Sequence, residues 1–167
     1  QEASRKFGMS AKQTMMIAQQ LYETGHITYM RTDSVNMADF ALQQAQQVIK
    51  ENFGNDYTLN QPRRYTTKSK GAQEAHEAIR PTDLTQKPEI LKRSLDSRQL
   101  KLYDLIWKRT IASQMQPAVF DQTAIDIVTS YQLPATSYTF RANGQVVKFD
   151  GFIRVYTEGR DEKDEED

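Results

Sequence analysis

The chain has 167 residues, of which 26% are charged and 38% are hydrophobic, with 22 basic and 22 acidic side chains. This length suits one domain, or one domain and part of a second. The absence of cysteine excludes a disulfide framework and a thiolate metal site, and two histidines argue against a histidine-based zinc site. The longest apolar runs, such as Met15 to Ala18, are far shorter than the roughly 20 residues that a membrane helix needs.

Charge is distributed unevenly along the chain. The ten residues from Glu158 to Asp167 carry seven acids and two bases, whereas the other 157 residues carry 20 bases and 15 acids. We therefore expect a mildly basic body that is compatible with nucleic-acid binding, and an acidic, disordered tail over residues 158–167. The chain begins with Gln1 rather than Met, so we expect it to be part of a larger protein, about which the lack of a visible secretory signal says little.

Two helices separated by a glycine-containing break are expected first. Residues 1–7 fit the end of a helix, which Gly8 interrupts. Ser10 then begins a second helix as its N-cap, with Gln13 placed for a capping box, and Gly25 ends that helix. This outline is typical of a helix-turn-helix motif, and equally of two packed core helices.

A short strand and a third helix follow. His26 to Met30 predict a strand, because β-branched and aromatic residues come directly after a helix stop, and Arg31 to Ser34 form a polar turn. Asn36 is the expected N-cap of the third helix, which ends at Gly54. Its predicted buried stripe consists of Phe40, Ala41, Ala45, Val48, Ile49 and Phe53.

Residues 55–75 are predicted to be irregular and basic. Residues 63–70 hold four bases, and no acid occurs between Asp56 and Glu74. Cations that pair with phosphates and an aromatic ring that stacks on a base suit a single DNA strand, although a solubilising loop has a similar composition. The predicted DNA-binding residues are Arg63, Arg64, Lys68 and Lys70, with Tyr65 for stacking.

The second half of the chain changes from helical to extended periodicity. Residues 72–79 predict a short helix before Pro81, and Ser97 to Met115 predict a long helix that Pro117 ends. Four strands are then expected, over residues 123–128, 138–142, 145–149 and 152–156, with Asn143-Gly144 as a two-residue hairpin turn. The predicted fold class is α+β, mostly α, with a thin antiparallel segment whose partner strands lie outside this chain.

The string from Ile27 to Ser34 carries the densest group of reactive side chains. Tyr29 and Arg31 are two residues apart, so they point the same way on an extended segment. A tyrosyl oxygen can attack a phosphodiester while a guanidinium neutralises the phosphate. Asp33 and its neighbours could hold Arg31 by hydrogen bonds. The same spacing is also typical of a strand without a catalytic role, in which Tyr29 packs in the core and Arg31 forms a surface salt bridge.

Residues 72–83 contain the second candidate. His76 and Arg80 are four residues apart and would share one face of a helix, where both could contact a phosphate. The string lacks the HExxH form of a zinc protease. Ordinary charge pairs on a solvated helix account for the same residues.

Four strings together resemble the type IA DNA topoisomerases, on the bacterial topoisomerase I branch. Met30 stands where the related topoisomerase III enzymes usually have proline. The likeness extends over most of residues 1–115, in order and spacing. The strings are Gln1 to Lys6, Ile17 to Glu23, Ile27 to Ser34 and Gln73 to Asp83.

This resemblance implies a mechanism. Tyr29 would attack one strand of single-stranded DNA and form a 5′-phosphotyrosyl bond, which is resealed after strand passage without ATP. Negatively supercoiled DNA would thereby be relaxed. Arg31 would hold the scissile phosphate, His76 would assist binding and cleavage, and Asp33 would contact DNA.

The resemblance also implies a domain organisation. Residues 1–116 would form the helical tyrosine domain, residues 117–157 a β section of the arch domain that acts as a hinge, and residues 158–167 the tail. Mg²⁺ would bind an acidic cluster of a TOPRIM domain that this chain lacks, so no metal is expected here and the isolated chain should be inactive. The expected partners are single-stranded DNA and the remaining domains of the parent protein, in the bacterial cytoplasm and at no membrane.

Two other classes of protein remain open. A non-catalytic winged-helix DNA-binding module would use the helix-turn-helix and the basic loop, and would not need the Tyr29 hydroxyl. An interaction scaffold would pair its β segment with a partner protein. This interpretation gives no functional role to the string from Tyr29 to Arg31.

Overall fold

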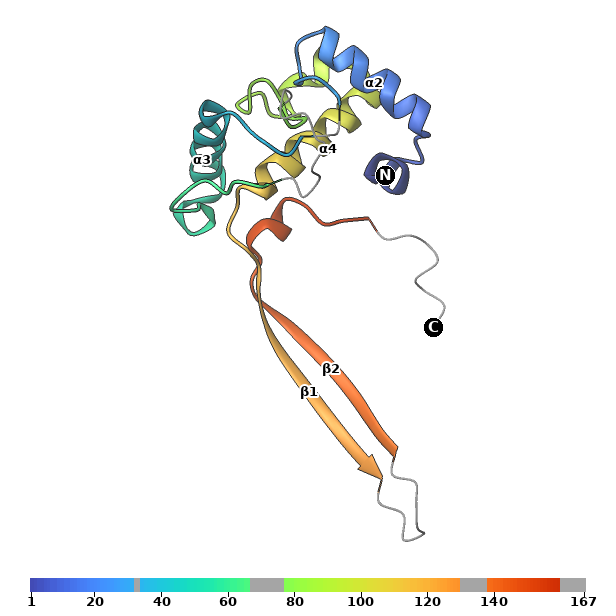
Figure 1. The fold of residues 1–167 in the computed structure, drawn as a ribbon, viewed down its shortest axis with the longest axis vertical. Coiled ribbons are helices and arrows are strands. Elements are labelled where there is room, and N and C mark those ends of the chain that lie inside the picture. Colours follow the sequence, from blue (N-terminus) through green and yellow to red (C-terminus); the bar gives the residue numbers. More distant parts are fainter. Residues whose placement is uncertain (32–33, 67–76, 130–137, 160–167) are drawn as a thin grey trace.

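A helical body carries one long β-hairpin that projects away from it (Figure 1). The computed structural model describes residues 1–31, 34–66, 77–129 and 138–159. Helices together with one antiparallel pair of strands confirm the predicted α+β class. No helix within the described ranges is long and apolar enough to cross a membrane.

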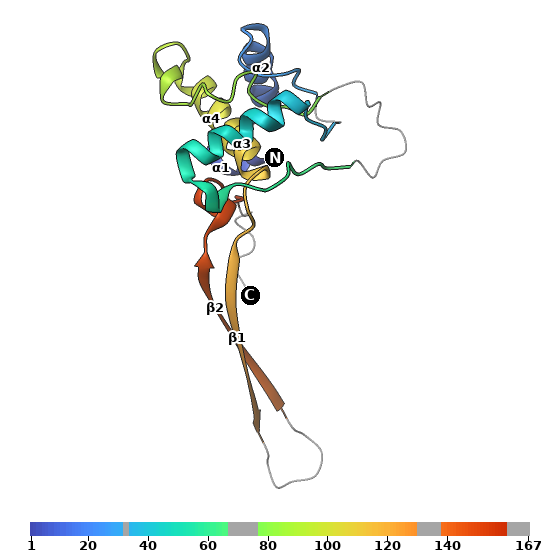
Figure 2. The same cartoon turned by 90° about the vertical axis from the view of Figure 1, so that its left-hand side faces the viewer.

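The body is built around one central helix. Its α-helices are α1 (Glu2–Phe7), α2 (Ala11–Glu23), α3 (Asp39–Phe53) and α4 (Ser97–Ser113). Helix α4 contacts each of the other three (Figure 2). Its buried side includes Tyr103, Trp107 and Ile111, which join Leu21 of α2 and Ile49 of α3 in one hydrophobic core. Core packing against α4 therefore holds the body together.

Local signals place helix α2 as predicted. The Gln13 N–H donates to Ser10 Oγ at 3.2 Å and the Ser10 N–H donates to Gln13 Oε1 at 3.0 Å, which completes the capping box. At the other end Gly25 has φ of 77°, and the His26 N–H donates to the Leu21 carbonyl at 2.8 Å. This bonding closes the helix in a Schellman motif.

The predicted start of α3 is wrong. Its N-cap is Ala38 rather than Asn36, and the Ala38 N–H donates to Glu77 Oε1 at 2.7 Å. Phe40 was expected in the buried stripe but is 60% exposed, whereas Leu42 is buried. A carboxylate from a distant part of the chain thus bonds the N–H of the N-cap residue, as an N3 side chain does in a capping box. The rest of the predicted stripe, Ala41, Ala45, Val48 and Ile49, is buried and Phe53 is partly buried.

The β segment is one hairpin rather than four strands. Strand β1 (Val119–Thr129) pairs antiparallel with β2 (Tyr138–Phe149). Asn143 and Gly144 lie in the middle of β2, opposite Ala124 and Thr123, so the predicted turn there is wrong. A type I′ turn requires positive φ, and Gly144 does not have it. The connection falls within residues 130–137, outside the described residues.

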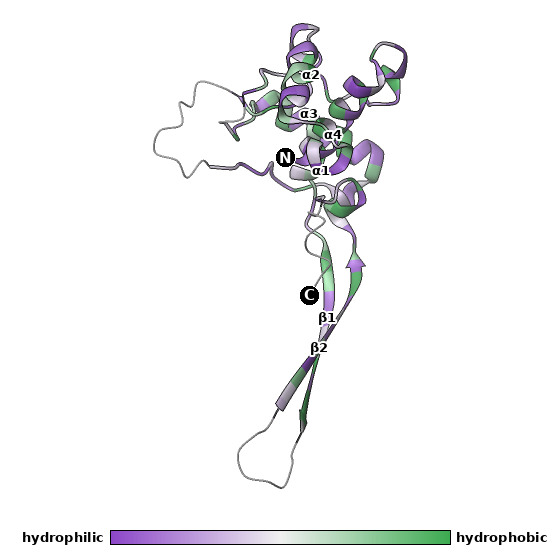
Figure 3. Ribbon diagram, turned by 90° about the vertical axis from the view of Figure 1, so that its right-hand side faces the viewer, coloured by the Kyte–Doolittle hydropathy of each residue, from purple (hydrophilic) through white to green (hydrophobic). Residues whose placement is uncertain are grey.

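The hairpin is amphipathic. On one face Ile125 lies opposite Ala142 and Ile127 lies opposite Phe140. On the other face Arg141 donates to both carboxylate oxygens of Asp126, at 2.7 and 2.8 Å. Apolar and polar residues are interspersed along both strands (Figure 3), and Ile125, Ile127 and Phe140 are exposed. A two-stranded hairpin is marginal by itself, so attachment to the body supports it.

The root of the hairpin is anchored to the body. The predicted strand over residues 152–156 is wrong, because the 3₁₀ helix η3 (Gly151–Arg154) turns the chain back. The Phe152 N–H donates to the Gln116 carbonyl at 3.0 Å. Tyr57, in the 3₁₀ helix η1 (Asn55–Tyr57), donates its hydroxyl to Asp150 at 2.7 Å and accepts from Arg154 at 2.8 Å.

Candidate active-site segment

Tyr29 lies on a segment held by a single β-bridge. The predicted strand over residues 26–30 reduces to one pairing, between Ile27 and Pro81. The Thr28 N–H donates to the Arg80 carbonyl at 2.9 Å, and the Thr82 N–H donates to the His26 carbonyl at 3.1 Å. High β propensity does not make a strand where the partner segment runs alongside for only three residues.

The side chain before Tyr29 locks this arrangement. The Thr28 hydroxyl donates to the Ala78 carbonyl at 2.7 Å and accepts from the Arg80 N–H at 2.9 Å. Tyr29 itself is 40% exposed, so it is not a core residue. Its ring meets the ring of Tyr22 from α2 edge to face, with centroids 5.2 Å apart. A fixed backbone therefore presents a partly exposed phenol.

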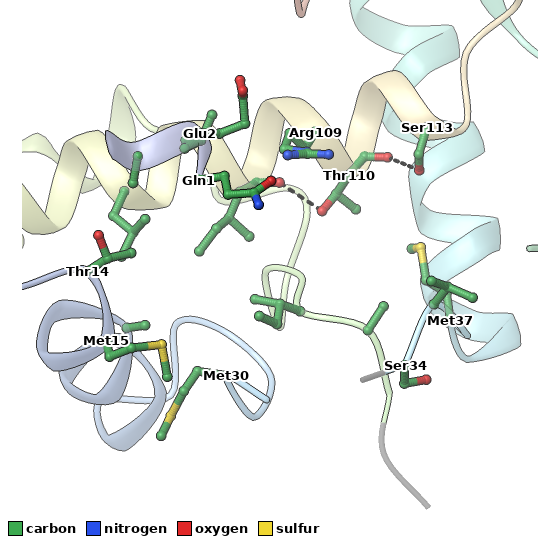
Figure 4. Close-up of a pocket in the computed structure, with 18 of the residues that line it drawn as sticks. Gln1, Glu2, Thr14, Met15, Met30, Ser34, Met37, Arg109, Thr110 and Ser113 are labelled. Carbon is green, nitrogen blue, oxygen red and sulfur yellow. Dashed lines mark hydrogen bonds between the residues drawn. The ribbon is translucent and has the colours of Figure 1, made fainter. Parts of the chain in front are cut away.

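Met30, which lies between Tyr29 and Arg31 in the sequence, lines a cavity. Met15, Met30 and Met37 line a mainly apolar cavity of about 570 Å³ between α2, α4 and the start of α1 (Figure 4). Tyr29 and Arg31 are not among its lining residues, and Arg31 is exposed. Both Tyr29 and Arg31 are therefore accessible to solvent, and the prediction that they point the same way stays a prediction.

Two other tyrosines, Tyr103 and Tyr156, are poorly suited to attack a phosphate. Tyr103 is buried, its hydroxyl donates to the Gln86 carbonyl at 2.7 Å, and burial together with the Asp83 charge raises its pKa. Burial and the hydrogen bond to Glu2 likewise raise the pKa of Tyr156. Raising the pKa disfavours the phenolate that acts as nucleophile.

The basic segment begins against the end of α4. The Arg63 N–H donates to Gln114 Oε1 at 3.0 Å, and Gln114 donates back to the Arg63 carbonyl at 3.0 Å. Arg64 is exposed and pairs with Asp39 at the start of α3, at 2.5 Å. The structure thus brings Arg64 to the N-terminal end of α3. Lys68, Lys70, Asp33 and His76 lie outside the described residues, so their predicted contacts stay predictions.

Arg80 does not occupy the expected helix face. Residues 77–80 are not helical, and Arg80 is only 2% exposed. Its guanidinium donates from Nε and Nη2 to the two carboxylate oxygens of Glu77, at 2.6 and 2.9 Å. A buried and paired guanidinium cannot bind a DNA phosphate, so that part of the second candidate is wrong. The three-residue spacing of Glu77 and Arg80 was the only sequence signal for the pair.

Comparison with known proteins places this segment in a family. The family model described as DNA topoisomerase matches residues 1–167. The chain belongs to the DNA topoisomerase family. It is 47% identical over 175 residues to DNA topoisomerase 1 of Rickettsia prowazekii and 48% identical over 164 residues to that of Synechocystis. These alignments cover 100% and 98% of this chain, but 22% and 18% of the two relatives.

A solved structure supports the same family. The full-length topoisomerase I from Thermotoga maritima is 38% identical to this chain, with a TM-score of 0.75 over 96% of the chain and 26% of that structure. The chain thus spans about a fifth of the length of the curated relatives it matches. The resemblance seen in the four strings is confirmed at the level of the family.

Proposed function

We propose that this chain is the tyrosine-bearing section of a bacterial type IA topoisomerase, in which Tyr29 cleaves and reseals one DNA strand. The observation that carries the proposal is the fixed, partly exposed Tyr29 with Arg31 two residues on, in a chain of this family. Residues 1–116 would form the tyrosine domain and residues 117–157 part of the arch, with residues 158–167 as a tail.

The proposed chemistry conserves the number of phosphate ester bonds. The Tyr29 oxygen attacks the phosphorus, its proton passes to a base, and a tyrosine–phosphorus ester forms as the bond to the 3′ oxygen breaks. The 3′ oxygen takes up a proton and becomes a free hydroxyl. Resealing reverses both steps and needs no ATP. Arg31 would neutralise the phosphate, and positive charge aimed at developing negative charge lowers the barrier.

Mg²⁺ does not fit the described residues. No group of three or more His, Cys, Asp and Glu side chains that could hold a metal occurs within residues 1–31, 34–66, 77–129 and 138–159. Mg²⁺ prefers several oxygen ligands in octahedral geometry. We therefore assign its binding to the remaining domains of the full enzyme, where the family has its TOPRIM domain, and expect the 167-residue chain alone to be inactive.

DNA is the proposed partner, above all single-stranded regions of negatively supercoiled DNA. Arg31, Arg63 and Arg64 would bind it together with Asp33, His76, Lys68 and Lys70. The proposed location is the bacterial cytoplasm, at the nucleoid.

Covalent trapping on end-labelled single-stranded DNA tests the proposal. We expect the full-length enzyme carrying this chain to form an adduct in Mg²⁺ buffer that Tyr29→Phe abolishes. Tyr22→Phe is the matched control, because Tyr22 is equally exposed and touches the Tyr29 ring. An adduct that survives in Tyr29→Phe would move the nucleophile elsewhere. Intact DNA binding with no adduct in the wild type would favour the non-catalytic binding module.

A further inference from the structure

The ion pair of the buried Arg80 and the partly exposed Glu77 is bonded to the Tyr29 segment through Arg80. The backbone of Arg80 forms two hydrogen bonds to Thr28: its carbonyl accepts from the Thr28 N–H, and its N–H donates to the Thr28 hydroxyl. The guanidinium of Arg80 binds Glu77. The residue immediately before Tyr29 is thus bonded through both its backbone and its side chain to one arginine.

The guanidinium holds its own segment in shape. Besides the two bonds to Glu77, Nη1 donates to the Pro81 carbonyl at 2.7 Å. The exposed ring of Phe40 covers the guanidinium at 4.9 Å from its centroid. Residues 77–80 belong to no helix or strand, so these side-chain bonds replace the backbone ladder that would otherwise fix them.

Glu77 extends the network to a second element. Its Oε1 accepts both from Arg80 Nε at 2.6 Å and from the Ala38 N–H at 2.7 Å, where α3 begins. One carboxylate therefore ties the start of α3 to the segment on which Tyr29 rests. A forked guanidinium and a carboxylate determine geometry in a way that a flexible lysine cannot.

We infer that Glu77 and Arg80 are positioning residues, which act through Thr28 to set where the Tyr29 oxygen stands relative to the scissile phosphate. This inference rests on the proposed function of Tyr29. Neither residue touches DNA in this role. Attack requires the reacting atoms in line at roughly 3–3.5 Å, and a misplacement of about 1 Å can cost on the order of 100-fold in rate.

Single-turnover cleavage by the full-length enzyme carrying this chain tests the inference. The variants are Arg80→Lys, which keeps the charge and loses the fork, and Glu77→Gln, which keeps an acceptor for Ala38. We expect the cleavage rate constant to fall about 10- to 100-fold, with the fraction of cleaving molecules and the dissociation constant for single-stranded DNA changed less than about twofold. Thr28→Val removes the hydroxyl link while Glu77 and Arg80 stay paired, and should slow cleavage in the same way.

Val48→Ala is the matched stability control. Val48 is buried in α3 and takes no part in the network. It should lower the melting temperature and leave the rate constant of the folded enzyme unchanged. The inference is overturned if Arg80→Lys, Glu77→Gln and Thr28→Val cleave at the wild-type rate, or lose only the fraction of active molecules, as a purely structural role requires. If the wild type forms no Tyr29 adduct, the proposed function fails and the inference falls with it.

Discussion

Replacing Gly151 by alanine should destabilise this protein more than the same replacement at Gly25. Both glycines have positive φ, 48° at Gly151 and 77° at Gly25. That conformation costs an L-residue roughly 1–2 kcal/mol. A Cβ at Gly25 would meet nothing within 4 Å, whereas at Gly151 it would lie 2.6 Å from the Gln116 carbonyl oxygen and from the Pro117 carbonyl group.

The crowding at Gly151 comes from backbone atoms that are themselves held. The Gln116 N–H donates to the Tyr57 carbonyl and the Gln116 carbonyl accepts from the Phe152 N–H, both at 3.0 Å. The overlap is relieved only if the hairpin root moves. Overpacking costs roughly 1–3 kcal/mol in addition to the strain. We therefore expect a loss of about 1–2 kcal/mol for Gly25→Ala and about 2–5 kcal/mol for Gly151→Ala.

Urea unfolding of the 167-residue chain measures both losses. Trp107 is the single tryptophan and is buried, so its fluorescence reports on the body, and far-UV circular dichroism reports on the helices. In a thermal scan, each kcal/mol lowers the melting temperature by roughly 2–4 °C at this size. Equal losses at the two positions would refute the argument that backbone crowding holds the hairpin root.

Three further predictions concern the cap, the buried carboxylate and the basic segment. Ser10→Ala should cost about 1 kcal/mol in urea unfolding, because the Gln13 N–H loses its acceptor, whereas Ser10→Thr should cost less. Burial works to raise the pKa of Glu2, but hydrogen bonds from Tyr156, Gly159 and Arg5 hold it below the ordinary 4.5. A carboxyl group whose pKa is lower in the folded state than in the unfolded state stabilises the protein above the unfolded-state pKa, and this stability is lost as the pH falls through the folded-state pKa. Glu2→Gln should therefore be less stable than the wild type at pH 7. Its melting temperature should also drop less than that of the wild type below about pH 4.5. Arg64→Ala should reduce the slope of log K against log salt for single-stranded DNA by about 0.7 in a binding titration. Arg141→Ala, on the hairpin and paired with Asp126, should leave that slope unchanged.

Two short-range signals predicted the ends of helix α2 correctly. The capping box at Ser10 and the glycine stop at Gly25 involve residues within five positions of one another, and both are confirmed. The hairpin turn at Asn143-Gly144 was also a short-range signal, yet it is wrong. The pairing of β1 with β2 runs through those two residues, so the backbone ladder of two long strands outweighs the preference of one dipeptide.

The candidate site, too, was predicted only in part from the sequence. The two-residue spacing of Tyr29 and Arg31, together with the resemblance of the surrounding strings, singled out the segment, and the chemistry proposed for it stays a prediction. Spacing could not say that Arg80 is buried on Glu77 rather than presented to a phosphate. The burial of Arg80 depends on which distant segments pack against it. The sequence of residues 77–80 alone does not predict that Thr28 lies beside them.

The sequence by itself therefore predicted the helical body, the ends of α2 and the candidate pair of Tyr29 and Arg31, because each depends on side chains that are neighbours along the chain. Three contacts were decided only by the tertiary structure. Glu77 accepts a hydrogen bond from the start of α3, Arg80 is hydrogen-bonded to Thr28 beside Tyr29, and the hairpin root packs on Gln116. Those contacts join residues 36 to 52 positions apart, and a hydrogen bond forms wherever a buried donor finds an acceptor, whatever their separation along the chain.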